Sequence, residues 1–169
     1  MANTDRPMGF EPVGHHSGGE IRTRNYVVTT GQTIFKGDPV IMTNGGTISI
    51  AAAGATTTHL GIAAEYVSSS AAGAEIAVWD DPNILYKIQT TNSITTTVSN
   101  VFNTSDIITY AAGNTTTGQS IMELDTPGTS SLPWIIIGLA GDADNAWGEF
   151  SKVVVKYNQS VWIGAYAGL

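Results

Sequence analysis

The chain has 169 residues, a mass of 17.7 kDa, no cysteine and a net charge of −7, which gives an isoelectric point near 4.6. A domain of this length can bury a core without disulfide bonds, and without cysteine neither a disulfide scaffold nor a thiolate metal site can form. Only 12% of the residues are charged, while 22 Thr, 13 Ser and 10 Asn supply polarity, a composition that disfavours helical bundles and, with the acidic charge, nucleic-acid binding.

The first 24 residues differ from the rest of the chain. They contain all three arginines, which balance the acidic residues of this segment, so the net negative charge belongs to residues 25–169. Prolines and glycines interrupt the segment, and Phe10 is its largest apolar residue. We predict an extended N-terminal arm over residues 1–24 and a β domain over residues 25–169, with a disordered tail as the alternative for the arm.

The segment after the N-terminal methionine contains no apolar run, so we expect neither a signal peptide nor a transit peptide. The longest apolar run, residues 134–140, is too short to cross a bilayer. No membrane association is expected.

Short apolar segments separated by turn residues follow the arm, a spacing typical of an all-β sandwich or barrel. Residues 75–79 and 84–88 alternate between apolar and polar side chains, which predicts strands with one buried face. The runs at 135–137 and 153–155 do not alternate, which favours strands covered on both faces, placed centrally in a sheet or under a neighbouring subunit. Strands are expected at residues 26–30, 39–43, 47–51, 60–67, 75–79, 84–90, 106–110, 121–125, 134–140, 153–157 and 160–164.

Turn and helix signals complete the expected fold. Asn44-Gly45-Gly46 predicts a hairpin because these residues tolerate positive φ. Only residues 98–102 and 143–150 could form short helices. The predicted fold is therefore all-β: one compact β-sandwich or barrel-like domain with an extended N-terminal arm and at most one or two short helices.

Two short sequence segments each recur later in the chain, at the same distance in both cases. Residues 61–63 resemble residues 138–140, and residues 76–78 resemble residues 153–155. Internal duplication of a strand pair is one explanation. Coincidence is the other, because short apolar words are common in β proteins.

No catalytic machinery is evident in the sequence. His15 and His16 are adjacent, which places them on opposite faces of an extended chain, and no further metal ligands converge with them or with His59. Nucleophile and phosphate-binding motifs are absent. The segment that starts at Asp142 fails as a calcium loop because Trp147 stands where glycine is needed. We expect no catalytic residues, metal or cofactor, although a carboxylate pair for glycoside cleavage depends on the fold and stays open.

Tryptophan offers two interpretations. Trp134, Trp147 and Trp162 are candidates for a subunit or partner interface, since tryptophan is enriched where two surfaces meet. Trp79, which ends an alternating strand beside two aspartates, is the best candidate for stacking on a sugar.

Several sequence words occur in a characteristic order. They are NTDRPMGFEPV at residues 3–13, GDPV at 37–40, TGQS at 117–120 before ELD at 123–125, GLA at 138–140 and DADNAWG at 142–148. In this order the chain resembles head decoration (cement) proteins of tailed bacteriophages, and the similarity spans most of its length.

The resemblance implies a structural virion protein rather than an enzyme. It would be made in the host cytoplasm, form a homotrimer, bind the major capsid protein on the outer surface of the capsid and stabilise the expanded head by bridging capsomers. Neither nucleic acid nor membrane would be a partner. The contacts expected in the capsid-binding arm are Arg6, Pro7, Phe10, Pro12, Arg22 and Arg24, with the arginines facing carboxylates and Phe10 acting as an apolar anchor. A carbohydrate-binding β-sandwich module and a tail or baseplate component are the alternatives.

Overall fold

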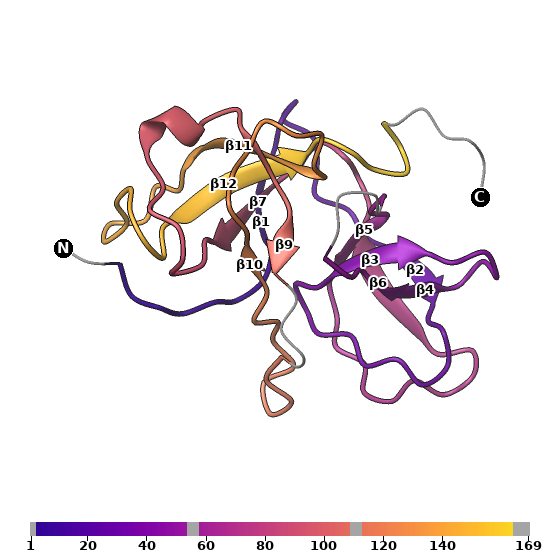
Figure 1. The fold of residues 1–169 in the computed structure, drawn as a ribbon. Helices are drawn as coiled ribbons and strands as arrows, with labels where there is room; N and C mark the ends of the chain where they lie inside the picture. Colours follow the sequence, from indigo (N-terminus) through magenta and orange to yellow (C-terminus); the bar gives the residue numbers. More distant parts are fainter. Residues whose placement is uncertain (1–2, 54–57, 109–112, 164–169) are drawn as a thin grey trace.

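The structure is a computed structural model that describes residues 3–53, 58–108 and 113–163. These residues contain twelve strands and one turn of 3-10 helix, so the all-β prediction is confirmed. Two five-stranded antiparallel sheets lie side by side (Figure 1). A two-stranded pair, β9 (Ile107–Ile108) with β10 (Glu123–Leu124), lies beside the first sheet.

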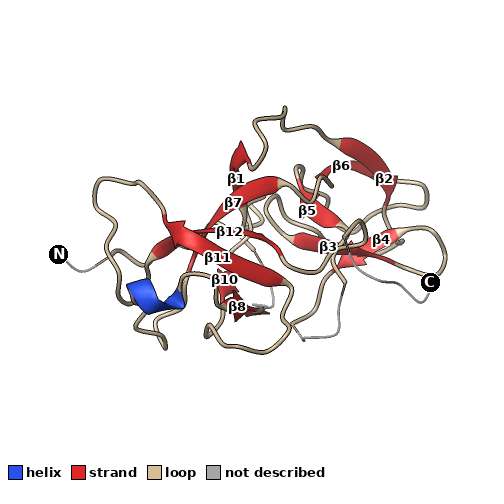
Figure 2. Ribbon diagram, turned by 90° about the horizontal axis from the view of Figure 1, so that it is seen from above, coloured by secondary structure: helices blue, strands red, loops and turns tan. Residues whose placement is uncertain are grey.

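The first sheet has the strand order β1-β7-β12-β11-β8. Its strands are β1 (Glu11–His15), β7 (Ile84–Gln89), β12 (Lys152–Tyr157), β11 (Trp134–Leu139) and β8 (Thr104–Ser105). One face packs on an aromatic core that includes Phe10, Tyr86, Trp134 and Tyr157. The 3-10 turn η1 (Val98–Asn100) lies at the end of this sheet that is remote from the second sheet (Figure 1, Figure 2).

The second sheet has the order β2-β6-β5-β3-β4. Its strands are β2 (Arg24–Val27), β6 (Glu75–Trp79), β5 (Gly61–Ala63), β3 (Pro39–Met42) and β4 (Ile48–Ile50). A parallel bridge between Val28 and Ile48 brings the chain after β2 to the other edge strand, so the sheet curls toward a barrel. It surrounds an aliphatic core of its own.

Several predicted elements are confirmed. Strand β6 has the predicted bounds, and strands β7 and β12 differ from prediction by one residue. Strands β3 and β4 form the hairpin predicted around Asn44-Gly45-Gly46, with Gly46 at φ +76°.

Other elements differ from prediction. Strands β1 and β8 were not expected, and residues 143–150 form turns and bends instead of a helix. No strand occupies the described part of 160–164, where Ser160 makes only an isolated bridge to His59. The predicted strand at 106–110 is shorter in its described part, and residues 109 and 110 lie outside the described residues.

Within the single chain, the runs at 135–137 and 153–155 are fully buried on one face alone, so coverage of the second face by a neighbouring subunit stays a prediction. In β12 Val153 and Val155 are buried while Val154 is half-buried, so one face meets the core and the other does not. In β11 a register shift between Ile136 and Gly138 interrupts the same alternation. The central position of β12 is as expected.

The two repeated sequence words form antiparallel strand pairs in both sheets, but with different registers. Ile62 in β5 faces Trp79, whereas the corresponding Leu139 in β11 faces Val153. A duplicated pair that had kept its register would place Leu139 opposite Lys156. The geometry therefore does not preserve the pairing of a repeated unit.

Candidate partner-binding surfaces

Part of the predicted N-terminal arm belongs to the β domain. Strand β1 pairs with β7, and Phe10 is 1% exposed, with its ring stacked 4.2 Å from that of Trp134. Gly9, with φ +65°, turns the chain so that Phe10 points into the core. The backbone amide of Phe10 donates a 3.0 Å hydrogen bond to the Gly37 carbonyl. Phe10 therefore fills the core of its own chain instead of standing free as an anchor for a partner, and no boundary falls between residues 24 and 25.

The residues before Phe10 lie against the domain through specific hydrogen bonds. The Asn3 side-chain amide donates to the carbonyls of Ala146 and Glu149 at 2.8 and 2.7 Å. The Arg6 amide donates to Gln89 Oε1 at 3.0 Å, and Gln119 Nε2 donates to the Met8 carbonyl. Pro7 and Pro12 are half-buried along this path. The segment is thus docked along the body of its own chain.

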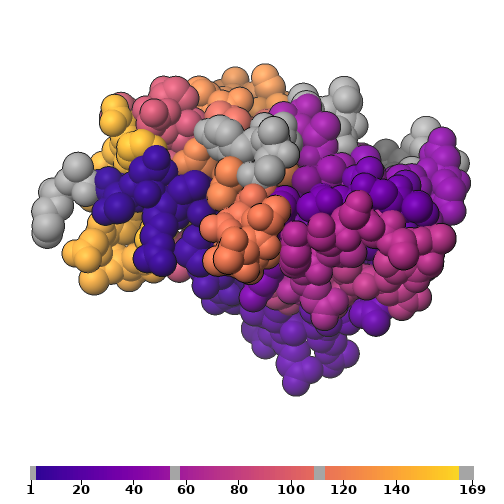
Figure 3. All heavy atoms as spheres, turned by 90° about the horizontal axis from the view of Figure 1, so that it is seen from below, coloured from indigo at the N-terminus to yellow at the C-terminus, as the bar shows by residue number. Residues whose placement is uncertain are grey.

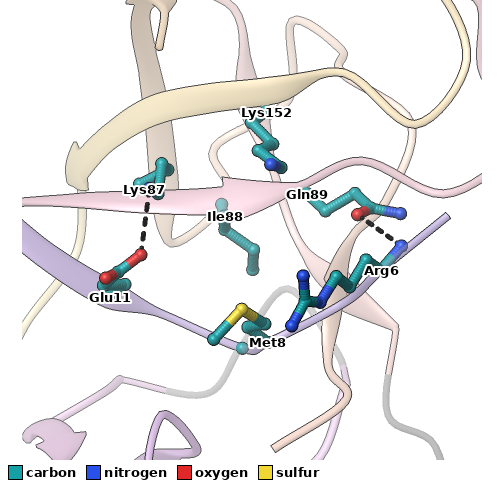
Figure 4. A pocket seen from close by; sticks show the side chains of 8 residues that line it. Arg6, Met8, Glu11, Lys87, Ile88, Gln89 and Lys152 are labelled. Atoms are coloured by element: carbon teal, nitrogen blue, oxygen red, sulfur yellow. Dashed lines mark hydrogen bonds and ion pairs between the residues drawn. The ribbon is translucent and has the colours of Figure 1, made fainter. Parts of the chain in front are cut away.

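A small hollow of about 40 Å³ lies beneath the docked segment (Figure 4). It is lined by Arg6, Met8, Gly9, Glu11, Lys87, Ile88, Gln89 and Lys152. Lys87 Nζ pairs with Glu11 at 3.0 Å and with Asp142 at 3.5 Å, and Lys152 Nζ pairs with Asp142 at 3.4 Å. Partial burial acts to lower the pKa of Lys87, but the carboxylates of Glu11 and Asp142 outweigh this effect, so the pKa is raised.

Arg6 differs from the two lysines because its guanidinium makes no ion pair with any described residue. Its side chain borders the small hollow and a larger polar one of about 370 Å³ on the side of Asp142. An exposed, unpaired guanidinium can bind a carboxylate without first breaking an internal pair. Sequence reasoning identified Arg6 and missed Lys87 and Lys152, although the alternation of β7 and β12 predicts that both face away from the core.

The loop between β1 and β2 projects from the body (Figure 2, Figure 3). All residues from 16 to 25 are exposed. Arg22 lies on this loop and pairs with Glu20 at 3.1 Å, with both side chains about four-fifths exposed. Such an exposed pair adds little to stability, because solvent screens the charges. Arg22 is thus free to exchange its partner.

Arg24 and Trp162, which sequence reasoning assigned to separate surfaces, meet at the base of this loop. The Arg24 guanidinium lies 5.4 Å from the ring centroid of Trp162, a cation–π distance, and its Nε is 3.4 Å from the Asp80 carboxylate. Asp80 is 5% exposed and accepts a 2.6 Å hydrogen bond from the Tyr26 hydroxyl. Burial, together with that carboxylate, raises the pKa of Tyr26 to about 12, so the hydroxyl stays protonated as a donor. Trp162 is 49% exposed.

The other predicted interface tryptophans occupy different environments. Trp134 is fully buried among the rings of Phe10, Tyr86 and Tyr157, so its assignment to an interface is wrong. The reason is that Trp134 begins β11 and its side chain faces the core. Trp147 is half-buried and packs against the same core. Trp162 is the one of the three that is exposed.

The histidines do not form a metal site. His15 Nε2 lies 3.1 Å from Asp81, His16 is exposed, and His59 is fully buried with both ring nitrogens unpartnered. Burial lowers the pKa of His59 to about 4, which keeps its imidazole neutral. Within residues 3–53, 58–108 and 113–163, no group of three His, Asp or Glu side chains could hold a metal ion.

A hollow of about 240 Å³ lies beside Trp79, the predicted sugar contact. Its lining combines the half-buried Trp79 ring with the polar side chains of Glu11, Lys36 and Gln119. An aromatic face bordered by hydrogen-bonding groups suits a small polar ligand.

Comparison of the chain with protein-family models, with curated proteins and with solved structures finds no match. Among the described residues no helix has the length and apolar character to span a membrane.

Proposed function

We propose that this protein is a phage head decoration (cement) protein, a non-enzymatic structural component of the virion. It binds the major capsid protein on the outer surface of the capsid and stabilises the expanded head by bridging capsomers. The observation that carries the proposal is the exposed pair of Arg24 and Trp162, backed by the buried Asp80 and the half-buried Tyr26.

The chemistry of this pair suits a protein partner. Tryptophan, tyrosine and arginine dominate the residues that contribute most to protein interfaces, because they bury large area and still form directed polar contacts. Asp80 and Tyr26 hold Arg24 in place, so little side-chain freedom is lost on binding. Many copies on one shell let modest contacts act together. The homotrimer remains part of the proposal on the strength of the resemblance.

Capsid binding can be tested with purified expanded heads that lack this protein, mixed with the chain and sedimented. We expect Trp162→Ala and Arg24→Ala each to weaken binding by about tenfold or more, as for central interface residues. The binding of Arg24→Lys should be weaker than that of the wild type and stronger than that of Arg24→Ala, because an ammonium keeps the charge but loses the planar stacking group. Glu75→Gln, at an exposed position on the second sheet, serves as the control. Undiminished binding by Trp162→Ala and Arg24→Ala would assign the contact elsewhere.

A carbohydrate-binding module is the second candidate, favoured by the hollow beside Trp79. A glycan array that shows specific binding, lost in Trp79→Ala, would select it. A tail or baseplate component would share the surfaces described here and differ in location. Immunogold labelling of virions distinguishes the head from the tail.

A further inference from the structure

The two most exposed large apolar side chains of the described residues lie on one loop. Val98 is 70% exposed and Phe102 is 69% exposed, whereas the others, Met8, Val13, Ile21, Trp162 and Ile163, are 40–49% exposed. Val98 begins η1, and Phe102 follows it before β8. This loop thus exposes two large apolar side chains, Val98 and Phe102, which are together called the apolar knob.

Phe102 has a backbone conformation that does not suit phenylalanine. Its φ is +65°, in the left-handed region that favours glycine and asparagine. Its amide donates to the Ile136 carbonyl at 2.8 Å, and the Ile136 amide donates to the Asn103 carbonyl at 3.0 Å, so strand β11 imposes this conformation.

The fold does not account for the aromatic ring at this position. Glycine would adopt the same backbone with less strain, and a side chain that is 69% exposed contributes little to the core. Residues that violate a local preference without a gain inside the molecule are expected at functional sites. A contact outside the chain would account for the ring.

The loop is ordered before any partner arrives. The Thr97 amide donates to Asn100 Oδ1 at 2.7 Å, and the Thr97 hydroxyl lies 2.7 Å from that of Ser99. The Val101 and Asn103 amides donate to the carbonyls of Val98 and Asn100 at 3.2 and 3.0 Å. A preformed knob loses little conformational entropy on binding.

Charge selects the kind of partner. No charged residue occurs from Ile88 to Ser105, in a chain whose net charge is −7. Insertion of a loop into an anionic lipid surface is normally supported by nearby lysine or arginine, which this segment lacks. An apolar pocket with an uncharged rim on a protein is the better fit.

We propose that Val98 and Phe102 insert into an apolar pocket on an uncharged surface of the capsid shell protein, as a second docking point beside the Arg24–Trp162 pair. The inference rests on the proposed function and deepens it. The η1 turn and strand β2, which carries Arg24, lie toward opposite ends of the molecule (Figure 1, Figure 2). Two separated contacts of different chemistry suit a protein that bridges neighbouring capsomers.

Phe102→Gly tests the proposal without endangering the fold, because glycine relieves the strain at φ +65° while removing the ring. We expect binding to expanded heads to weaken by about tenfold or more, with an unchanged or higher Tm. The loss should persist at high salt, since the contact is apolar. Val98→Ser should act in the same direction, and Val13→Ser, which is 48% exposed on β1, should not.

Each remaining outcome would overturn the inference. If Phe102→Gly binds expanded heads as tightly as the wild-type chain does, the docking role of the knob is refuted and the proposed function still stands. If analytical ultracentrifugation shows that the wild-type chain self-associates and that Phe102→Gly does not, the knob binds a second copy of this chain. Wild-type binding to phosphatidylcholine–phosphatidylglycerol vesicles that the variant loses assigns it to lipid. Failure of the wild-type chain to bind heads at all refutes the proposed function and this inference with it.

Discussion

Gly9 decides where Phe10 goes, because only a residue without a side chain fits its site. A Cβ at this position would lie 2.5 Å from Ser120 Cβ and 2.7 Å from the Gly37 carbonyl oxygen, and the φ of +65° is unfavourable for other residues. The turn lets Phe10 enter the aromatic core directly after an extended segment. A single glycine thus converts the start of an apparent arm into part of the domain.

We expect Gly9→Ala to lower the free energy of unfolding by about 2 kcal/mol or more, from the left-handed backbone plus the clash with Ser120. Gly18→Ala is the matched control, since Gly18 has φ +75° but no atom within 4 Å of an added Cβ. Its cost should be only the conformational part, about 1 kcal/mol. Urea unfolding measures both values. Equal losses in the two variants would mean that the close approach of Ser120 is unimportant.

At the residue scale, the sequence predicted chemistry better than location. Arg24 and Trp162 were each identified as contact residues, but their meeting depends on the path of the C-terminal segment past β2. Phe10 was assigned to a partner because prolines and glycines around it hide any strand pattern. Val98 and Phe102 bound a predicted short helix, but nothing in the sequence marked them as contact residues, because positive φ and exposure are properties of the fold.

Two truncations should distinguish the contribution of the docked N-terminal segment from that of strand β1. Deleting residues 1–8 removes the hydrogen bonds of Asn3, the Arg6 amide and the Met8 carbonyl, but leaves Phe10 in the core. We expect a folded protein with a lower Tm and a near-UV circular dichroism spectrum close to that of the full chain. Deleting residues 1–15 also removes an edge strand and Phe10, and should abolish the aromatic signal.

A chain lacking residues 1–15 that keeps its near-UV spectrum would contradict the integration of β1 into the first sheet. Asn3→Ala provides the smallest version of the first truncation, because it removes three hydrogen bonds to residues 146 and 149 without changing the length of the chain.

Predictability of the elements followed the clarity of their alternation. Strands β6 and β7 alternate over most of their length and were located to within a residue. Strand β1 escaped prediction because Pro12 and Gly14 resemble breakers, although a register shift between them absorbs the irregularity at the sheet edge. Strand β8 is two residues long, and it is held by its pairing with β11 and by an antiparallel bridge between Thr104 and Gly128. Such pairing is a long-range property that a local pattern cannot reveal.

At the scale of the whole molecule, two cores of different chemistry lie side by side. The first is aromatic, the second aliphatic, and Ile50 packs against both. Two of the buried ionisable side chains have pKa values shifted so as to oppose each other: His59 contacts the rings of Trp134 and Tyr157, and Asp38 precedes β3 of the second sheet. Their opposite responses to protons give the folded molecule an unusual dependence on pH.

His59 destabilises the fold in acid. Burial lowers its pKa from 6.5 to about 4, so between these values the unfolded chain binds a proton that the folded chain does not. Stability therefore rises with pH across this window. Asp38 acts in reverse: burial, only partly offset by hydrogen bonds from Ser120 and the Phe35 amide, raises its pKa from 3.8 to about 6. The folded chain then holds the extra proton, and stability falls as pH rises from 3.8 to 6.

The two contributions should nearly cancel between about pH 4 and 6, since each pKa difference is about 2 units and each unit corresponds to about 1.4 kcal/mol. Removing either group exposes the other. Relative to the wild-type curve, His59→Phe should lose stability with rising pH by a few kcal/mol across this window, and Asp38→Asn should gain a similar amount. Urea unfolding at a series of pH values gives the difference curves. Parallel curves for the three proteins would show that neither group titrates differently in the folded and unfolded chains.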